Sequence, residues 1–336
     1  MSNVGKKDNK KAKSSSSIMG PLLAAILLGV VLAFASNKFL TLTNLMNILR
    51  QSSINIIVGA GMLFCLLGAG IDLSQGSIVG ISMGMITVLH LNGIDNSFLM
   101  IVLPVVVGAV CGLVNGLLYT KLKLPHPFVS TLGMMEALRG LTLLITNSKQ
   151  VSGFPEAVTW LGDANIGFFP VCFVAVIIIS ILITFMLNKT AIGREIYSVG
   201  GNREAARLAG INIDKTLTVT YIMSGLLCGF AAVILVGRVG ATYPLAGEGY
   251  EMDAVAACVI GGASFNGGKG TMIGTFVGAI IMAEIKNGLN LVGAASDVQQ
   301  IVVGIVVILA VMVDVFRTQA ADKNRRLAQA KSEPAA

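Results

Sequence analysis

Ten apolar segments, most of them long enough to cross a membrane, follow one another along almost the whole chain. A transmembrane helix needs about 20 mainly apolar residues, because it must span a hydrocarbon core about 30 Å thick. Charged residues make up only 12% of the sequence, about half of their share in soluble domains. The sequence therefore predicts an all-α polytopic membrane protein. The predicted spans are 19–36, 51–68, 74–91, 97–120, 127–146, 167–187, 216–237, 251–264, 270–289 and 298–316.

Two of these segments are poor candidates for complete, regular crossings. Segment 74–91 is rich in glycine and serine, and segment 251–264 has only 14 residues. Such segments are typical of re-entrant or broken helices inside transporters. Each also precedes a G-x3-G-x3-G helix, and the two copies lie five spans apart, so they would run in opposite directions. This weak internal similarity indicates a possible inverted five-helix repeat.

The distribution of basic residues predicts the orientation. With the N-terminus in the cytoplasm and ten alternating spans, 18 of the 24 lysines and arginines fall on the cytoplasmic side and three on the other side. This asymmetry follows the positive-inside rule and explains the net charge of +7 without nucleic-acid binding. We therefore expect a cytoplasmic tail at 1–18, a transmembrane domain at 19–316 and a second cytoplasmic tail at 317–336.

The longest polar stretch between the apolar segments is the predicted cytoplasmic loop 188–215. Its sequence favours a short helix, with Asn202 as the N-cap, Glu204 in the first turn and Gly210 as the C-cap. The alternative is an ordinary solvated loop. A helix here would have a small apolar face suited to docking on a partner, formed by Ala205, Ala206, Leu208 and Ala209.

The glycine-rich segment 261–270, GGASFNGGKG, superficially resembles a phosphate-binding loop. A Walker motif requires a serine or threonine after its lysine, whereas Gly270 follows Lys269 here. We interpret the segment as a glycine turn beside the cytoplasmic face and predict no nucleotide site. The chain also lacks a catalytic triad or metal-ligand cluster, so an enzyme is not expected.

Its five cysteines lie in apolar segments without CxxC spacing and are expected to be buried, without a disulfide or a metal.

Ionisable residues within spans commonly mark function. Glu136 and Arg139 are three residues apart on one helix and could neutralise each other, whereas Glu284 and Lys286 would not face each other. Asp72 and Asp253 each begin a short small-residue segment, where the carboxylate could cap the helix or, less often, contact a substrate. The candidate residues for a substrate path are Gln51, Ser53, Asn55, Asp72, Asn115 and Asp253.

Several ordered motifs carry a resemblance to a known family. They include NLMNILRQSSIN (44–55), GIDLSQGSIVG (70–80), FVSTLGMMEALRG (128–140), GREIYSVGGNREAARLAGIN (193–212) and GYEMDAVAACVIGGASFNGGKGTMIGT (249–275). The chain resembles the permease subunits of bacterial monosaccharide ABC importers of the ribose, galactose and arabinose type, most closely the ribose branch. Residues 204–210 are similar to the E-A-A-x-x-x-G pattern by which such permeases engage their ATPase. No I-x-L-P follows at the usual spacing.

The resemblance implies one half of a permease homodimer in the bacterial inner membrane. Two separate ATP-binding subunits would hold ATP and magnesium, and a periplasmic sugar-binding protein would deliver a monosaccharide, most simply a ribose-like pentose. No cofactor is expected in this chain. The implied coupling residues are Arg194, Tyr197, Asn202, Arg203, Glu204, Ala205, Ala206, Arg207 and Gly210. An ion-coupled secondary transporter of a small polar solute is the main alternative, and a channel is a further one; the energy source distinguishes the first two.

Overall fold

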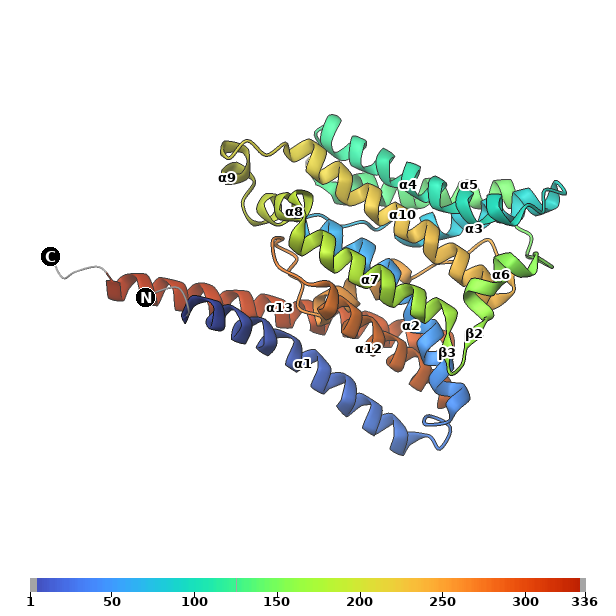
Figure 1. The fold of residues 1–336 in the computed structure, drawn as a ribbon, viewed down its shortest axis with the longest axis horizontal. Helices are drawn as coiled ribbons and strands as arrows, with labels where there is room; N and C mark the ends of the chain where they lie inside the picture. The colour runs from blue at the N-terminus through green and yellow to red at the C-terminus, as the bar shows by residue number, and fades with distance from the viewer. Residues whose placement is uncertain (1–4, 125, 333–336) are drawn as a thin grey trace.

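The protein is a bundle of long helices with very little sheet (Figure 1). The computed structural model describes residues 5–124 and 126–332. The long helices are α1 (Gly5–Ala35), α2 (Leu42–Leu67), α3 (Gln75–Leu91), α4 (Ser97–Lys121), α5 (Pro127–Thr146), α7 (Val171–Lys189), α10 (Ile213–Val239), α12 (Met272–Leu291) and α13 (Ser296–Ser332). The short helices are α6 (Glu156–Asp163), α8 (Ala191–Gly201), α9 (Arg203–Leu208) and α11 (Tyr250–Ile260).

Four two-residue strands complete the fold. Strand β1 (Val151–Ser152) pairs antiparallel with β4 (Ala241–Thr242), and β2 (Asn165–Ile166) pairs antiparallel with β3 (Phe169–Pro170). The second hairpin occupies the start of the predicted span 167–187, so helix α7 begins later than predicted. Proline at position 170 provides no backbone N–H, and α7 starts directly after it.

The prediction of an all-α polytopic membrane protein is confirmed. In the part of the chain that the structure describes, seven helices are long and apolar enough to cross a membrane, and segment 19–35 of α1 and helix α3 are shorter apolar helices. Helix α5 has the predicted bounds. The predicted span 251–264 is an 11-residue helix, α11, which is too short to cross a membrane alone.

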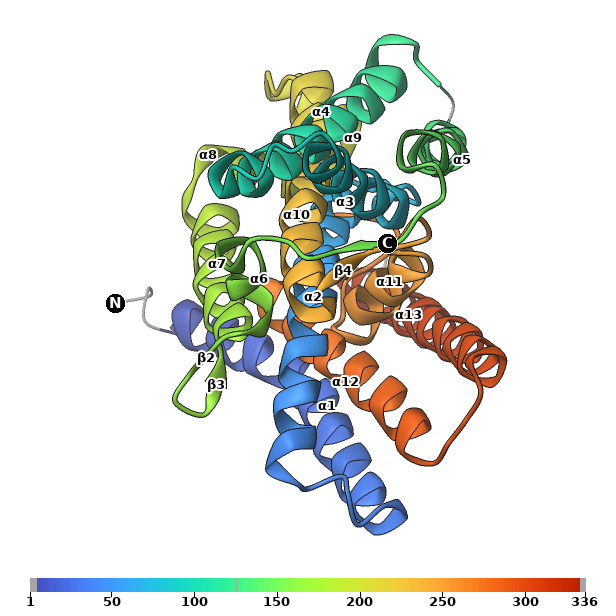
Figure 2. The same ribbon diagram turned by 90° about the vertical axis from the view of Figure 1, so that its right-hand side faces the viewer.

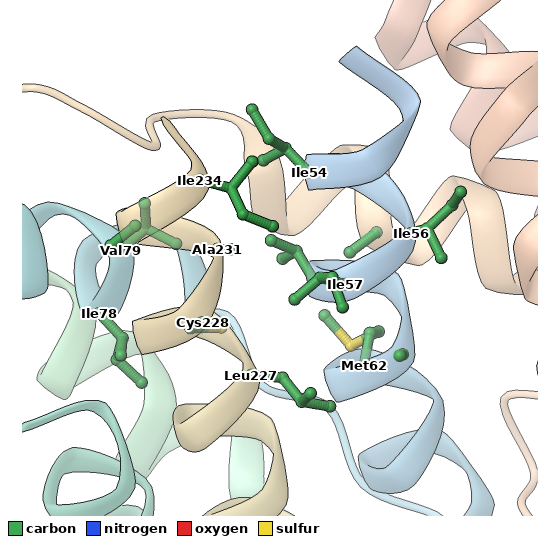
Figure 3. Packing of buried hydrophobic residues seen from close by; sticks show 14 of the residues in the cluster. Ile54, Ile56, Ile57, Met62, Ile78, Val79, Leu227, Cys228, Ala231 and Ile234 are labelled. Atoms are coloured by element: carbon green, nitrogen blue, oxygen red, sulfur yellow. The ribbon is translucent and has the colours of Figure 1, made fainter. Parts of the chain in front are cut away.

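Helix α2 lies at the centre of the bundle and is the main element of the core. Its Ile54, Ile57 and Met62 lie among apolar side chains of α3 and α10 (Figure 3). Helices α4, α7 and α13 instead expose long apolar stretches on the outside, as lipid-facing or partner-facing helices do. Helix α2 also buries the polar side chains of Ser52, Ser53 and Asn55.

Glycines bring helices α4 and α10 into backbone contact. A Cβ at Gly108 would overlap the carbonyl oxygen of Gly225, and one at Gly112 would overlap that of Tyr221. In a bilayer, helices associate through such close packing, because lipid is as apolar as the side chains it would replace. The predicted G-x3-G-x3-G helix of the first half therefore packs tightly on the second half.

The chain is broken before both α3 and α11, as predicted. Residues 68–74 separate α2 from α3, and residues 243–249 separate β4 from α11. The first turn of α3 meets the second of these breaks, where Gly76 touches Gly247. Gly247 has φ +81°, a left-handed conformation that glycine adopts without strain.

The helix pairings follow the order expected for two inverted halves. Helix α4 packs on α10, as α12 packs on α2; helix α3 contacts α10, α4 and α5, as α11 contacts α2, α12 and α13. Exchanging the two halves of the chain converts one set of pairings into the other. This arrangement supports the inverted five-helix repeat that the two similar motifs indicate.

Helices α8 and α9 lie at the same end of the molecule as the first turns of α1 and the last turns of α13 (Figure 1). Helix α6 and the hairpin β2–β3 lie at the other end, which faces the viewer in Figure 2. The loop 188–215 and the two predicted tails thus share one side. Within those tails, α1 and α13 continue as helices to Gly5 and Ser332, and residues 1–4 and 333–336 lie outside the described residues.

Candidate functional sites: an exposed helix and a polar pocket

The loop 188–215 folds into α8, α9 and the first turn of α10, each with a side-chain N-cap. The Oδ1 atom of Asn202 accepts the N–H of Ala205 at 3.0 Å, which confirms the predicted cap of α9. Thr190 caps α8 in the same way, through the N–H of Gly193 at 3.2 Å. The prediction that Gly210 is the C-cap was wrong, because Ala209 is the C-cap of α9. Gly210 follows it with φ +80°, a left-handed conformation that glycine favours at the end of a helix.

The predicted apolar face of α9 is divided between the interior and the surface. Ala206 is buried against Val199, Leu217 and Tyr221, so it anchors α9 to the chain and is not free to contact a partner. Leu208 points the other way and is 85% exposed. Ala205 and Ala209 are also exposed. The helix therefore presents a small apolar surface beside an exposed ion pair between Glu204 and Arg207, whose closest atoms are 2.7 Å apart.

The remaining predicted coupling residues mostly contact their own chain. The Tyr197 hydroxyl donates to the carbonyl oxygen of Gly270 at 2.8 Å, and burial raises the pKa of this tyrosine. The Arg203 guanidinium lies 5.7 Å from the ring centre of Tyr119, over the ring. Such contacts hold a side chain in place. Arg194 is exposed on α8.

A polar pocket of about 700 Å³ lies between α5, α11, α12 and α13. Because the last turns of α13 lie at the same end of the molecule as α9, the first turns of α13, which line the pocket, lie in the opposite half (Figure 1). The charged and polar residues of its lining are Arg139, Glu248, Glu251, Asp253, Lys286, Ser296, Gln299 and Gln300. Amides, carboxylates and cations of this kind bind the hydroxyl groups of a polar solute.

Two ion pairs form one wall of this pocket. One guanidinium nitrogen of Arg139 lies 3.2 Å from a carboxylate oxygen of Glu251, and the other terminal nitrogen lies 3.6 Å from one of Glu136. The second contact confirms the predicted pairing along α5. Lys286 pairs with Asp253, whose side chain is 1% exposed. Pairing is required here, because an unpaired charge inside a membrane protein is costly.

The pairing of Asp253 corrects the prediction that its carboxylate caps α11. The N-cap of α11 is Gly249, and no side chain caps this helix. Asp253 instead lies one turn further along, where it faces α12. The prediction that Glu284 and Lys286 do not face each other agrees with the structure, since Lys286 turns to Asp253.

Asp72 lies in a second, fully buried polar cluster. Its Oδ1 accepts the hydroxyl and the backbone N–H of Ser74 at 2.6 and 3.1 Å, and its Oδ2 accepts the Ser224 hydroxyl at 2.7 Å. Asn115 donates to the Ser74 oxygen at 2.7 Å. The cap prediction is thus corrected here too, because Ser74 is the N-cap of α3 and Asp72 holds Ser74. Asp72 and Asn115 hold the broken helix together in this conformation.

The other predicted path residues lie on α2, away from the polar pocket. Gln51 is half-buried, and the Ser53 hydroxyl donates to the carbonyl oxygen of Leu49, one turn earlier, at 2.7 Å. The amide nitrogen of Asn55 is buried without a partner among the described residues. Of the six predicted path residues, only Asp253 lines the polar pocket.

The structure adds Arg139, Glu251 and Lys286 to the candidate path. Sequence reasoning considered Arg139 and Lys286 only beside neighbours on their own helices, because spacing shows neighbours only along one helix. The glycine-rich segment 261–270 is a turn on the α9 side, as interpreted, and its carbonyl at Gly270 contacts α8. The five cysteines are buried and free, as expected of small apolar side chains.

Comparison with known proteins gives the class of this membrane protein. Residues 44–311 match the family described as branched-chain amino acid transport system, permease component. The chain belongs to this family of transport permeases.

Its curated relatives include sugar permeases. The ribose import permease protein RbsC of Escherichia coli K12 is 40% identical over 300 residues, which cover 87% of this chain and 92% of the relative. RbsC of Bacillus subtilis is 38% identical over 88% of this chain and 92% of the relative. The D-allose transport system permease protein AlsC of Escherichia coli K12 is 37% identical, over 87% and 89% respectively. No solved structure matches the chain.

Proposed function

We propose that this permease is the membrane subunit of an ATP-driven monosaccharide importer and that α9 docks on a separate ATPase subunit. The observation that carries the proposal is the capped helix α9, which exposes Leu208 next to the ends of the membrane helices. A helix that passes on the movement of a docked partner must be fixed to its own chain and must also expose an apolar surface. In α9, buried Ala206 provides the first and exposed Leu208 provides the second. An ion-coupled carrier has no need for such a helix.

The proposed substrate is a ribose-like pentose, since two of the compared relatives are ribose permeases and the polar pocket carries hydroxyl-binding groups. Two copies of the chain would form a homodimer in the bacterial inner membrane, with both termini and α9 in the cytoplasm. A periplasmic binding protein would deliver the sugar. ATP and magnesium would bind the ATPase subunits, because segment 261–270 lacks the hydroxyl residue of a phosphate loop.

The docking proposal predicts the effect of a charge on the exposed face of α9. We expect Leu208→Glu to remove the ATPase subunit from a pull-down of detergent-solubilised permease, because a carboxylate cannot be desolvated in an apolar contact. The matched control is Leu122→Glu, since Leu122 is also an exposed leucine, 64% exposed, but follows α4. Retention of the ATPase by Leu208→Glu, or its absence from the wild-type pull-down, would contradict the proposal.

The path proposal predicts that filling the polar pocket blocks uptake. Gln300→Trp would place a bulky ring in the pocket, and we expect uptake of labelled ribose to fall at least about tenfold while the ATPase still co-purifies. Ile305→Trp is the control, because Ile305 is 51% exposed on the same helix and does not line the pocket. Equal uptake by the two variants would exclude this pocket from the path.

A further inference from the structure

Helix α8 rests on the start of the broken segment 68–74 and on the turn 261–271, which joins α11 to α12. Gly200 touches the carbonyl oxygen of Leu67, the last residue of α2, so closely that a Cβ at Gly200 would overlap it. The same carbonyl accepts the N–H of Gly268 at 3.0 Å. A Cβ on Gly267 would lie 2.6 Å from both Ala69 and the oxygen of Gly200. The backbones of α8, the end of α2 and the turn 261–271 are therefore in direct contact, and no flexible side chain lies between them to absorb a displacement.

Tyr197 ties α8 to the turn that joins α11 and α12. Its hydroxyl donates to the carbonyl oxygen of Gly270 at 2.8 Å, and α12 begins two residues later at Met272. The turn 261–271 continues α11, which carries Glu251 and Asp253 of the polar pocket. A movement of α8 along this bond therefore reaches the pocket through α11 and α12.

A line of aromatic contacts ties α9 to the broken segment 68–74. Arg203, at the start of α9, lies over the ring of Tyr119, and Tyr119 meets Tyr221 edge-on with ring centres 6.2 Å apart. The Tyr221 hydroxyl donates to the carbonyl oxygen of Ile71 at 3.3 Å. Ile71 precedes Asp72, which holds the first turn of α3 through Ser74.

We propose that Tyr197 and Tyr221 are positioning residues that pass a movement of α8 and α9 to the turn after α11 and to the broken segment before α3 together. This inference rests on the proposed function, because the ATPase supplies the movement. Tyr197 acts on the turn 261–271, and Tyr221 acts on the segment 68–74. Because Gly76 of α3 touches Gly247 in the segment that leads into α11, moving α3 and α11 from the α9 side reorganises the contact between them. Neither tyrosine touches the sugar.

The test measures sugar transported per ATP hydrolysed in proteoliposomes that contain the permease, its ATPase and the binding protein. Tyr197→Phe and Tyr221→Phe each remove one hydroxyl-to-carbonyl bond and keep the ring. We expect each to lower that ratio about tenfold, the size of a typical coupling between sites, while the ATPase still assembles and hydrolyses ATP. Thr184→Val is the control, because it removes a 2.7 Å hydroxyl-to-carbonyl bond within α7.

An unchanged ratio in either tyrosine variant would overturn the role of that residue. A purely structural role would instead lower the thermal stability of the complex and its ATP hydrolysis along with uptake, leaving the ratio at its wild-type value. Uptake by the wild-type complex without ATP hydrolysis would contradict the proposed function itself and the inference with it. The ratio thus separates failure of the transmission route from failure of the importer assignment.

Discussion

Lys286→Met is expected to destabilise the permease by about 3–5 kcal/mol, the usual cost of leaving one partner of a buried ion pair uncompensated. The Asp253 side chain is 1% exposed, and Lys286 is the only cation that the structure places within ion-pair distance of it among the described residues. Methionine is one atom shorter than lysine and replaces its apolar stem without the charge. The loss is measured as a lower temperature at which detergent-solubilised protein ceases to be monodisperse.

Two further variants test the physical reason. Lys121→Met removes one partner of an exposed pair with Asp214, whose closest atoms are 3.9 Å apart, and should cost less than about 1 kcal/mol. Adding Asp253→Leu to Lys286→Met removes the stranded charge and should recover most of the stability. If the Lys286→Met variant were as stable as the Lys121→Met variant, the ion pair between Lys286 and Asp253 would contribute nothing to the stability of the fold.

Gly112→Val should separate helices α4 and α10 and cost about 3 kcal/mol or more, at the upper end of the range for overpacked sites. A Cβ at this position overlaps the carbonyl oxygen of Tyr221, so only a shift of a whole helix can make room. The expected result is a lower yield of monodisperse protein and a lower midpoint of thermal unfolding in detergent.

The matched control is Gly133→Val on α5. No heavy atom lies within 4 Å of a Cβ built at Gly133, and valine has a slightly better helix propensity than glycine. This variant should therefore be neutral or slightly stabilising. Equal stability of the two variants would show that α4 and α10 do not depend on close backbone contact.

The local features of this protein were predictable because they depend on neighbours in sequence. The apolar segments follow from the thickness of a bilayer, and the cap at Asn202 follows from the unpaired N–H groups at a helix start. The broken segments before α3 and α11 were also predictable, because short, glycine-rich stretches cannot span a membrane as regular helices.

The partners of the charged residues were not predictable in the same way. Arg139 and Glu251 are separated by 112 positions and Asp253 and Lys286 by 33, and both Arg139 and Asp253 had a nearer candidate role along their own helices. For the same reason Asp72 and Asp253 were assigned as helix caps, although each contacts residues beyond its own helix. Spacing along one helix cannot show which other helix lies opposite.

The sequence by itself determined that this chain crosses a membrane many times, which of its apolar segments are short or broken, and which loop forms the capped helix α9. Those properties depend on hydropathy and on capping within a few residues. Only the tertiary structure decided that Ala206 is buried while Leu208 is exposed, and that Asp253 lines a pocket while Asp72 is enclosed. The direction of each side chain depends on how helices distant in sequence pack, and in a membrane that packing is decided by close steric fit.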